Sequence, residues 1–217
     1  MNTPVKIYFF GDSICFGQYV SSHKTWVNRV SHKLDEFAAD HNNEIIVQNP
    51  SRNGDTTRQA LERMAYDVQS HDPDILYVQF GMNDCNYWVT DRGVPRVSGD
   101  AFTANLKEII TRALAFDVKH VFLATNHPST LDIEPFPYTE TTYQESNELY
   151  NKRVRDVIGM FTSKVSLIDI EQSFYKHAPD RDHLGKLVLA DGLHLSEAGH
   201  DLYVEVVYPE IKNILLK

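Results

Sequence analysis

The chain has 217 residues, a formal net charge of −9 and a hydrophobic fraction of 42%, which is typical of a single globular domain spanning residues 1–217. The negative charge, with basic residues scattered along the chain, argues against nucleic acid as a partner and against stable association with a membrane surface. No apolar run approaches the roughly 20 residues that a membrane-spanning helix needs.

Short apolar runs alternate with longer segments of helical spacing along the whole chain. Strands are expected at Val5–Phe10, Glu44–Asn49, Asp74–Phe80, His120–Asn126 and Val165–Asp169. Helices are expected at His23–Ala39, at Thr56–Gln69, at Phe102–Phe116, from about 143 to 161, and from a capping Ser196 through Ile211. This alternation predicts a parallel sheet covered by helices on both faces.

Two longer segments, Asn86–Gly99 and Pro128–Thr142, lack a clear period. Each follows the end of a predicted strand, so each either borders a functional site or is a surface excursion of the chain.

Gly11-Asp12-Ser13 follows the first predicted strand directly. This position places a serine hydroxyl at the carboxyl edge of the sheet, where α/β proteins hold their sites. The three residues alone are a weak indication, because turns use the same residue types. Three further segments strengthen it: Asn53-Gly54-Asp55, Gly81-Met82-Asn83-Asp84 and Asp191-Gly192-Leu193-His194.

Together these segments supply the parts of a serine hydrolase in chain order. Ser13 is the candidate nucleophile, and a serine needs a base to remove its proton. His194 is the candidate base, and Asp191, three residues earlier, is placed to orient the imidazole. The candidate oxyanion donors are the backbone N–H groups of Ser13 and Gly54 and the side-chain amide of Asn83.

The four segments resemble those of the SGNH hydrolase superfamily, also called GDSL esterases/lipases. The matching residues are Gly11-Asp12-Ser13, Gly54, Gly81-x-Asn83-Asp84 and Asp191-x-x-His194. The resemblance implies a flavodoxin-like three-layer α/β/α sandwich with a five-stranded parallel sheet. It also implies a Ser13–His194–Asp191 triad, an oxyanion hole of Ser13, Gly54 and Asn83, and no cofactor or metal. Ile14 stands where the family name expects leucine, a volume-conserving exchange.

The substrate is less well indicated than the chemistry. Tyr87 and Trp88 follow Asn83 closely, and with Asp12 they are the candidate substrate contacts. The alternative for the two aromatic residues is ordinary packing of their loop onto the domain. An aromatic surface there favours a short-acyl ester, such as an O-acetyl group on a carbohydrate or another small alcohol. The alternatives are a longer acyl ester or thioester, as in lysophospholipase or thioesterase activity, and a non-catalytic domain that binds glycans or acyl groups.

Several other polar residues favour structural roles. Asp180-Arg181-Asp182-His183 lacks convincing metal-ligand spacing, so no metal site is expected. Arg92 and Arg96 favour solvated surface charge over contact with an anionic substrate group, and His127 favours a structural role. Pro135-Phe136-Pro137-Tyr138 forms either a wall of the site or a protein contact.

Two cysteines, Cys15 and Cys85, do not make a disulfide framework and are expected to be packed thiols. No signal peptide is visible before the first strand, so a cytoplasmic location is expected.

Overall fold

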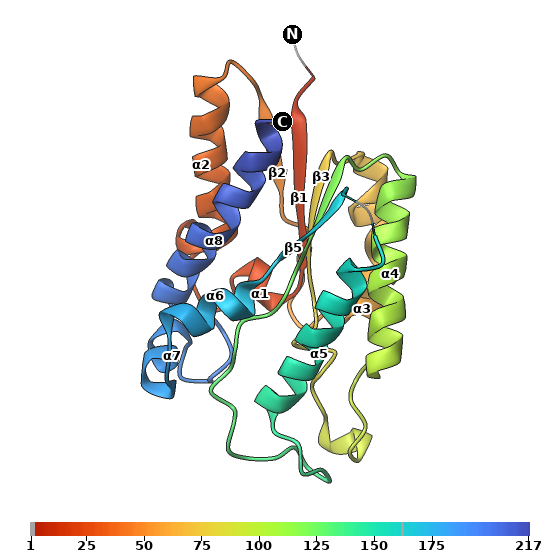
Figure 1. Ribbon diagram of the computed structural model, residues 1–217, viewed down its shortest axis with the longest axis vertical. Helices are drawn as coiled ribbons and strands as arrows, with labels where there is room; N and C mark the ends of the chain where they lie inside the picture. Colours follow the sequence, from red (N-terminus) through yellow and green to blue (C-terminus); the bar gives the residue numbers. More distant parts are fainter. Residues whose placement is uncertain (1–2, 162) are drawn as a thin grey trace.

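The computed structural model describes residues 3–161 and 163–217 of the chain. Its strands form one five-stranded parallel sheet in the order β2-β1-β3-β4-β5, which confirms the predicted α/β fold (Figure 1). The strands are β1 (Val5–Gly11), β2 (Ile45–Gln48), β3 (Ile75–Gln79), β4 (His120–Ala124) and β5 (Val165–Ile168).

The longer helices are α2 (Trp26–Asp40), α3 (Thr57–Asp67), α4 (Gly99–Ala115), α5 (Tyr143–Ile158) and α8 (Glu197–Leu215). Helix α2 begins later than predicted, because Ser22–Lys24 forms a 3-10 turn and Thr25 is extended. Helix α4 begins earlier, because Ser98 caps it by accepting a hydrogen bond from the backbone N–H of Ala101. Ser196 caps α8 as predicted.

Shorter helices complete the fold and were not predicted. They are α1 (Ser13–Phe16), α6 (Ile170–His177), α7 (Arg181–Leu187) and the 3-10 turns η1 (Ser22–Lys24), η2 (Gln69–His71) and η3 (Val89–Asp91). The last of these lies within Asn86–Gly99. The other segment without a clear period, Pro128–Thr142, contains a single bridge between Pro135 and Thr142.

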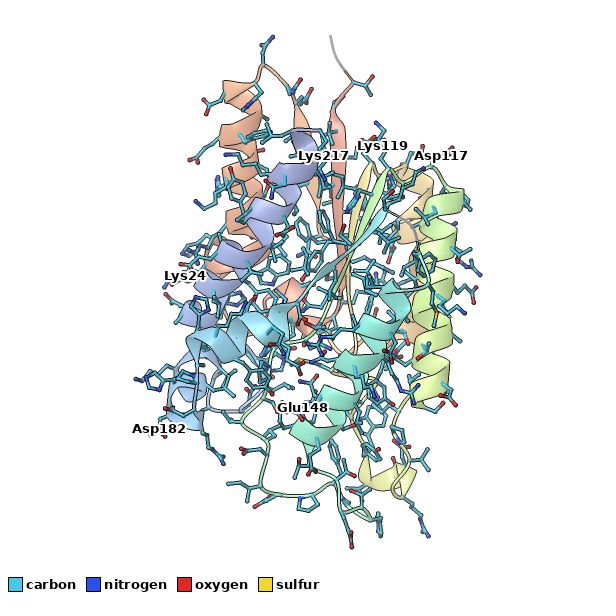
Figure 2. The ribbon with its side chains drawn as sticks, viewed as in Figure 1. Lys24, Asp117, Lys119, Glu148, Asp182 and Lys217 are labelled. Atoms are coloured by element: carbon cyan, nitrogen blue, oxygen red, sulfur yellow. The ribbon has the colours of Figure 1, made fainter. Side chains whose placement is uncertain are left out.

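Helices cover both faces of the sheet. On β1, Ile7 and Phe9 belong to the core beneath α2 and α8, whereas Tyr8 and Phe10 belong to the core beneath α3, α4 and α5 (Figure 1). Because helices bury both faces of the sheet, the strand sequences are continuous apolar runs rather than alternations of apolar and polar residues. Side chains fill both layers between sheet and helices, while charged residues such as Lys24 and Asp182 lie at the periphery (Figure 2).

The order of the strands creates a special position at the carboxyl end of β1. The chain leaves β1 through α2 to reach β2 on one side, and then crosses through α3 to β3 on the other side. Ligands in open α/β sheets bind at such a topological switch point. The Asn86–Gly99 and Pro128–Thr142 segments lie at the same end of the sheet, below the strands in Figure 1.

Cys15 and Cys85 are buried free thiols, as predicted. Cys15 lies within hydrogen-bond distance of the Gln79 side chain, and Cys85 lies near the carbonyl of Met82. Within residues 3–161 and 163–217, no helix has the length and apolar character required to cross a membrane.

Candidate active site

Ser13 lies at the first position of α1, immediately beyond β1. The turn between them depends on Gly11, because a Cβ there would lie 2.5 Å from Cys15 Sγ and 2.8 Å from the Gln79 carbonyl oxygen. Asp12 caps α1, its carboxylate accepting a hydrogen bond from the backbone N–H of Ile14 at 3.0 Å. The serine is therefore held at the switch point by a tight turn and a capped helix.

Ser13, His194 and Asp191 form one hydrogen-bonded row, although Ser13 and the other two lie at opposite ends of the chain. His194 Nε2 lies 3.0 Å from Ser13 Oγ, and His194 Nδ1 lies 2.6 Å from Asp191 Oδ2. The second oxygen of Asp191 accepts hydrogen bonds from the backbone N–H groups of Leu193 and His194, both at 3.0 Å. The structure thus brings together all three residues of the expected triad.

A backbone hydrogen bond joins the two ends of the short loop that carries Asp191 and His194. The N–H of Leu189 donates to the carbonyl of His194, and Gly192 adopts a φ of 74° that favours glycine. Partial burial alone would raise the pKa of Asp191, but the hydrogen bonds from Leu193 and His194 outweigh it and lower that pKa below its ordinary value. Asp191 is therefore ionised at neutral pH, beside the imidazole.

The candidate oxyanion donors lie on the neighbouring loops. Gly54 sits in an exposed turn with a φ of 81°. Asn83 Nδ2 lies 3.3 Å from Asp12 Oδ2 and 3.1 Å from the Asp55 carbonyl oxygen. Asn83 therefore spans the space between the Ser13 turn and the Gly54 turn.

Arg63 of α3 supports the Gly54 turn, a role that the sequence analysis missed. Its buried guanidinium pairs with Asp55 at 2.5 Å and with Asp67 at 3.0 Å. It also donates to the carbonyl groups of Pro50 and Gly11. The sequence contains one indication of this role. Arg63 lies within the apolar stripe of α3, and a charged residue in such a stripe is seldom buried without partners.

Two buried carboxyl groups lie behind the candidate oxyanion donors. Burial raises the pKa of Asp12 to about 7, and the nearby charges of Asp84 and Asp55 act in the same direction. Burial raises the pKa of Asp84 to about 6, although this carboxylate accepts a hydrogen bond from the backbone N–H of Thr57. Asp12, a candidate substrate contact, instead lies completely buried against Asn83.

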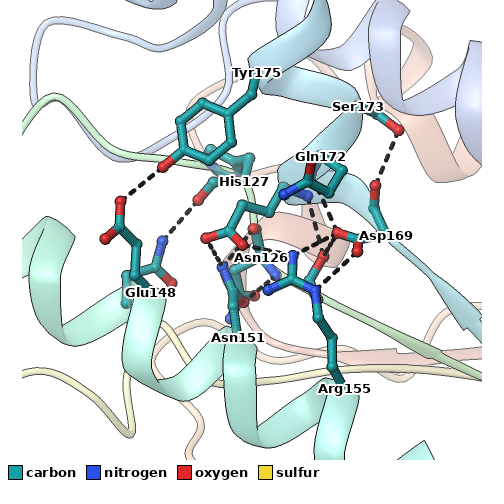
Figure 3. Close-up of polar contacts among 12 residues, drawn as sticks. Asn126, His127, Glu148, Asn151, Arg155, Asp169, Gln172, Ser173 and Tyr175 are labelled. Atoms are coloured by element: carbon teal, nitrogen blue, oxygen red, sulfur yellow. Dashed lines mark hydrogen bonds and ion pairs between the residues drawn. The ribbon is translucent and has the colours of Figure 1, made fainter.

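A polar network joins helices α5 and α6 to the residues that follow β4 (Figure 3). Asn126 and Asn151 exchange two hydrogen bonds at 2.8 Å and 3.0 Å, and Arg155 binds both carboxylate oxygens of Asp169. The next residue, His127, is buried and lies with Nε2 2.8 Å from the carbonyl oxygen of Leu193. His127 therefore has the structural role expected of it: it holds the residue before His194.

Tyr19 contacts the row of Ser13, His194 and Asp191, whereas Tyr87 and Trp88 contact residues of the long loops. Tyr19, missed by the sequence analysis, places its ring edge-on to His194 at 5.0 Å and is 71% exposed. Its position depends on a backbone φ of 70° that no sequence pattern indicates. Tyr87 stacks on Phe136 at 4.6 Å and so joins the two long loops. Trp88 is half-exposed, with the Arg96 guanidinium over its ring.

Asp180 and His183 have a local structural use. Asp180 caps α7 by accepting from the backbone N–H of His183, and its carboxylate also lies 2.7 Å from the His183 ring. Among the residues that the structure describes, no group of three His, Cys, Asp or Glu side chains is placed to hold a metal ion.

Comparison with known families gives a match to the GDSL-like lipase/acylhydrolase family over residues 9–202. The chain belongs to this family. The match confirms the resemblance to the SGNH hydrolase superfamily. An arylesterase of Vibrio mimicus is 28% identical over 106 residues, which are 49% of this chain and 47% of that protein. The chain thus aligns with about half the length of that relative.

Two solved structures share the fold. A lipase/acylhydrolase from Enterococcus faecalis superposes with a TM-score of 0.74 at 24% identity, over 97% of this chain and 96% of its own. An acetylxylan esterase from Geobacillus stearothermophilus superposes with a TM-score of 0.77 at 21% identity, over 95% of this chain and 94% of its own. Both alignments span nearly the whole length of each chain, so the fold is shared throughout.

Proposed function

We propose that the protein is a serine esterase with Ser13 as nucleophile, His194 as general base and Asp191 as the carboxylate that orients the imidazole. The observation that carries the proposal is the row of contacts at 3.0 Å between Ser13 and His194 and 2.6 Å between His194 and Asp191. A base within hydrogen-bond reach activates a serine hydroxyl, and a carboxylate on the far nitrogen selects the productive tautomer.

In the proposed reaction, His194 removes the hydroxyl proton as Ser13 Oγ attacks the ester carbonyl. The N–H groups of Ser13 and Gly54 and the amide of Asn83 stabilise the tetrahedral oxyanion. The contacts of Asn83 Nδ2 to Asp12 and Asp55, at 3.3 Å and 3.1 Å, are long enough to be exchanged for the oxyanion. His194 then protonates the leaving alcohol, and water hydrolyses the acyl-enzyme by the reverse path.

The preferred substrate is a short-acyl ester, such as an O-acetyl group on a carbohydrate or another small alcohol. The half-exposed indole of Trp88, close to Asn83 along the chain, supports a compact ring-shaped alcohol. The names of two relatives, an arylesterase and an acetylxylan esterase, agree with ester hydrolysis. Buried free thiols suit a reducing compartment, and we propose the cytoplasm.

The acyl preference is tested with p-nitrophenyl esters from acetyl to decanoyl. We expect kcat/KM to be highest for acetyl or propionyl, because each additional methylene gains its about 0.8 kcal/mol only where a groove buries it. A maximum at octanoyl or beyond would replace this proposal with lysophospholipase or thioesterase activity. On an acetylated sugar, Trp88→Ala should lower kcat/KM, whereas Tyr66→Ala, which removes an exposed aromatic ring from α3, should not.

Asn83→Ala is expected to lower kcat about 10²–10³-fold and to change KM far less, since an oxyanion donor acts mainly in the transition state. The measurement is steady-state kinetics on p-nitrophenyl acetate. Asn86→Ala is the control, because the side chain of Asn86 lies in the same loop and accepts a hydrogen bond from the backbone N–H of Tyr87. An unchanged kcat with a raised KM would instead assign Asn83 to ground-state binding.

A further inference from the structure

A surface pocket shares one residue, Arg96, with the surroundings of the candidate oxyanion donors. Its volume is about 380 Å³, and its lining includes Arg58, Trp88, Asp91, Val94 and Arg96. Arg58 comes from the first turn of α3, and the other four come from the loop that follows β3. The pocket is therefore built from the same two segments that carry Gly54 and Asn83.

Arg96 connects this pocket to the reaction centre. Its Nη1 lies 3.3 Å from the carbonyl oxygen of Gly54 and 3.4 Å from Oδ1 of Asn83. Its guanidinium carbon lies 4.2 Å from the centre of the Trp88 ring, and its backbone N–H donates to the carbonyl of Asn86 at 2.9 Å. The guanidinium thus contacts Gly54 and Asn83 and lies over the Trp88 ring, while the backbone hydrogen bond fixes the position of Arg96 in the loop.

The positive charge of the pocket is not neutralised by ion pairs. Seven arginines form ion pairs with carboxylates: Arg29, Arg52, Arg63, Arg112, Arg153, Arg155 and Arg181. Within residues 3–161 and 163–217, no such pair is formed by Arg58, Arg92 or Arg96. Asp91, the acidic residue of the lining, accepts a hydrogen bond from the backbone N–H of Trp88 at 3.3 Å.

Two of these three arginines, Arg58 and Arg96, line the pocket, although the chain as a whole has a net charge of −9. Guanidinium groups present planar, forked donors that match the oxygens of carboxylates and phosphates. A neutral sugar hydroxyl needs no such charge. The chemistry of the lining therefore fits an anionic group better than a neutral one.

We propose that Arg58, Arg96 and Trp88 form a subsite for an anionic substituent, a carboxylate or a phosphate, on the ester substrate. The proposal rests on the proposed esterase function and narrows its substrate class. Because the acyl group of the proposed substrate is short, the anionic substituent belongs to the alcohol. The substrate is then an acylated acidic alcohol, such as an O-acetylated acidic sugar, with the charged group beside Arg96 and the ester carbonyl at Asn83.

The test compares three acetyl esters of similar shape: 3-acetoxybenzoate, 3-acetoxyphenyl phosphate and the neutral 3-acetoxybenzamide. We expect kcat/KM for at least one of the anionic esters to exceed that of the amide by at least about tenfold at low salt, and the preference to shrink as salt is added. The anion with the larger preference distinguishes a carboxylate from a phosphate substrate.

Charge-removing variants locate the effect. Arg58→Gln and Arg96→Gln should each reduce the ratio of anionic to neutral kcat/KM to within about threefold of unity. Arg92→Gln is the matched control, because Arg92 is an exposed residue of the same loop outside the pocket lining. It removes the same charge and should leave the ratio unchanged. An equal loss in all three variants would indicate a general charge effect and overturn the subsite.

Failure of the subsite and failure of the esterase function give different results. Hydrolysis of all three esters at equal kcat/KM would overturn the subsite and leave the esterase function intact. If no ester is hydrolysed, the subsite is tested by calorimetric binding of 3-hydroxybenzoate, 3-hydroxyphenyl phosphate and 3-hydroxybenzamide to the wild-type protein. The subsite is supported if an anionic compound binds and the Arg58→Gln variant binds it more weakly. Equal or undetectable binding of all three compounds overturns the subsite.

Discussion

Ser13→Ala is expected to lower kcat/KM for p-nitrophenyl acetate by at least about 10⁴-fold, because the variant lacks the oxygen that forms the acyl-enzyme. The fold should remain, since the change removes one hydroxyl whose described partner is His194 Nε2 at 3.0 Å. A fluorophosphonate probe should label the wild-type protein at Ser13 and leave the variant unlabelled. Activity, labelling and thermal unfolding together separate a lost nucleophile from a lost fold.

Ser51→Ala is a matched control for this experiment. Ser51 is another buried serine near the carboxyl end of β1, and its hydroxyl donates to the carbonyl of Phe9. Its replacement should leave labelling and hydrolysis within about threefold of wild type. Retention of wild-type turnover by Ser13→Ala would assign the nucleophile elsewhere. Absence of both labelling and turnover in the wild-type protein would favour a domain that binds ligands without hydrolysing them.

The sheet was predictable from the sequence because its strands are buried on both faces. Runs such as Val5–Phe10 are continuously apolar, and each strand ends within two residues of its predicted bounds. The parallel order also places the carboxyl ends of β1 and β3 at one edge. For this reason Ser13 and Asn83, which are 70 residues apart in the sequence, were expected at the same edge.

Short helices and loop contacts were not predictable in the same way. Helices α6 and α7 have few turns and polar sequences, and α7 contains Gly185. Their positions depend on tertiary packing, in which Phe174 and Leu184 join the core beneath α8. The approach of Arg96 to Gly54 likewise depends on the path of a long loop. Surface charge was the favoured expectation for Arg96, and nothing in the local sequence indicates this contact.

Asp191→Asn is expected to lower kcat about 10⁴-fold while leaving the loop of His194 in place. The amide oxygen of the asparagine can still accept the two hydrogen bonds that Asp191 Oδ1 accepts, at 3.0 Å, from the backbone N–H groups of Leu193 and His194. Its NH₂ group, however, would face His194 Nδ1, so Nδ1 would become the acceptor and Nε2 would carry the proton. In that tautomer His194 cannot take the proton of Ser13. The measurement is kcat on p-nitrophenyl acetate.

The stability of Asp191→Asn should also depend on pH. The folded-state pKa of Asp191 is lowered, so its ionised form stabilises the fold at neutral pH, and this contribution disappears as the pH falls through the folded pKa. The variant should therefore have a slightly lower Tm than wild type at pH 7, and the two Tm values should converge in acid. A variant that merely disrupts the loop would keep the difference at every pH.

Asp180→Asn is the control that the chain itself supplies. Asp180 has the same spacing to a histidine and a similar geometry, with its carboxylate 2.7 Å from His183 Nδ1 and 2.9 Å from the His183 backbone nitrogen. It caps α7 rather than contacting the row of Ser13 and His194, so kcat should stay within about twofold of wild type. If Asp180→Asn lowered kcat as much as Asp191→Asn does, the effect would come from the loss of a negative charge anywhere on this side of the protein and not from the contact of Asp191 with His194. Retention of more than about a tenth of wild-type kcat in Asp191→Asn would remove Asp191 from the proposed triad, because a wrongly held tautomer costs far more than that.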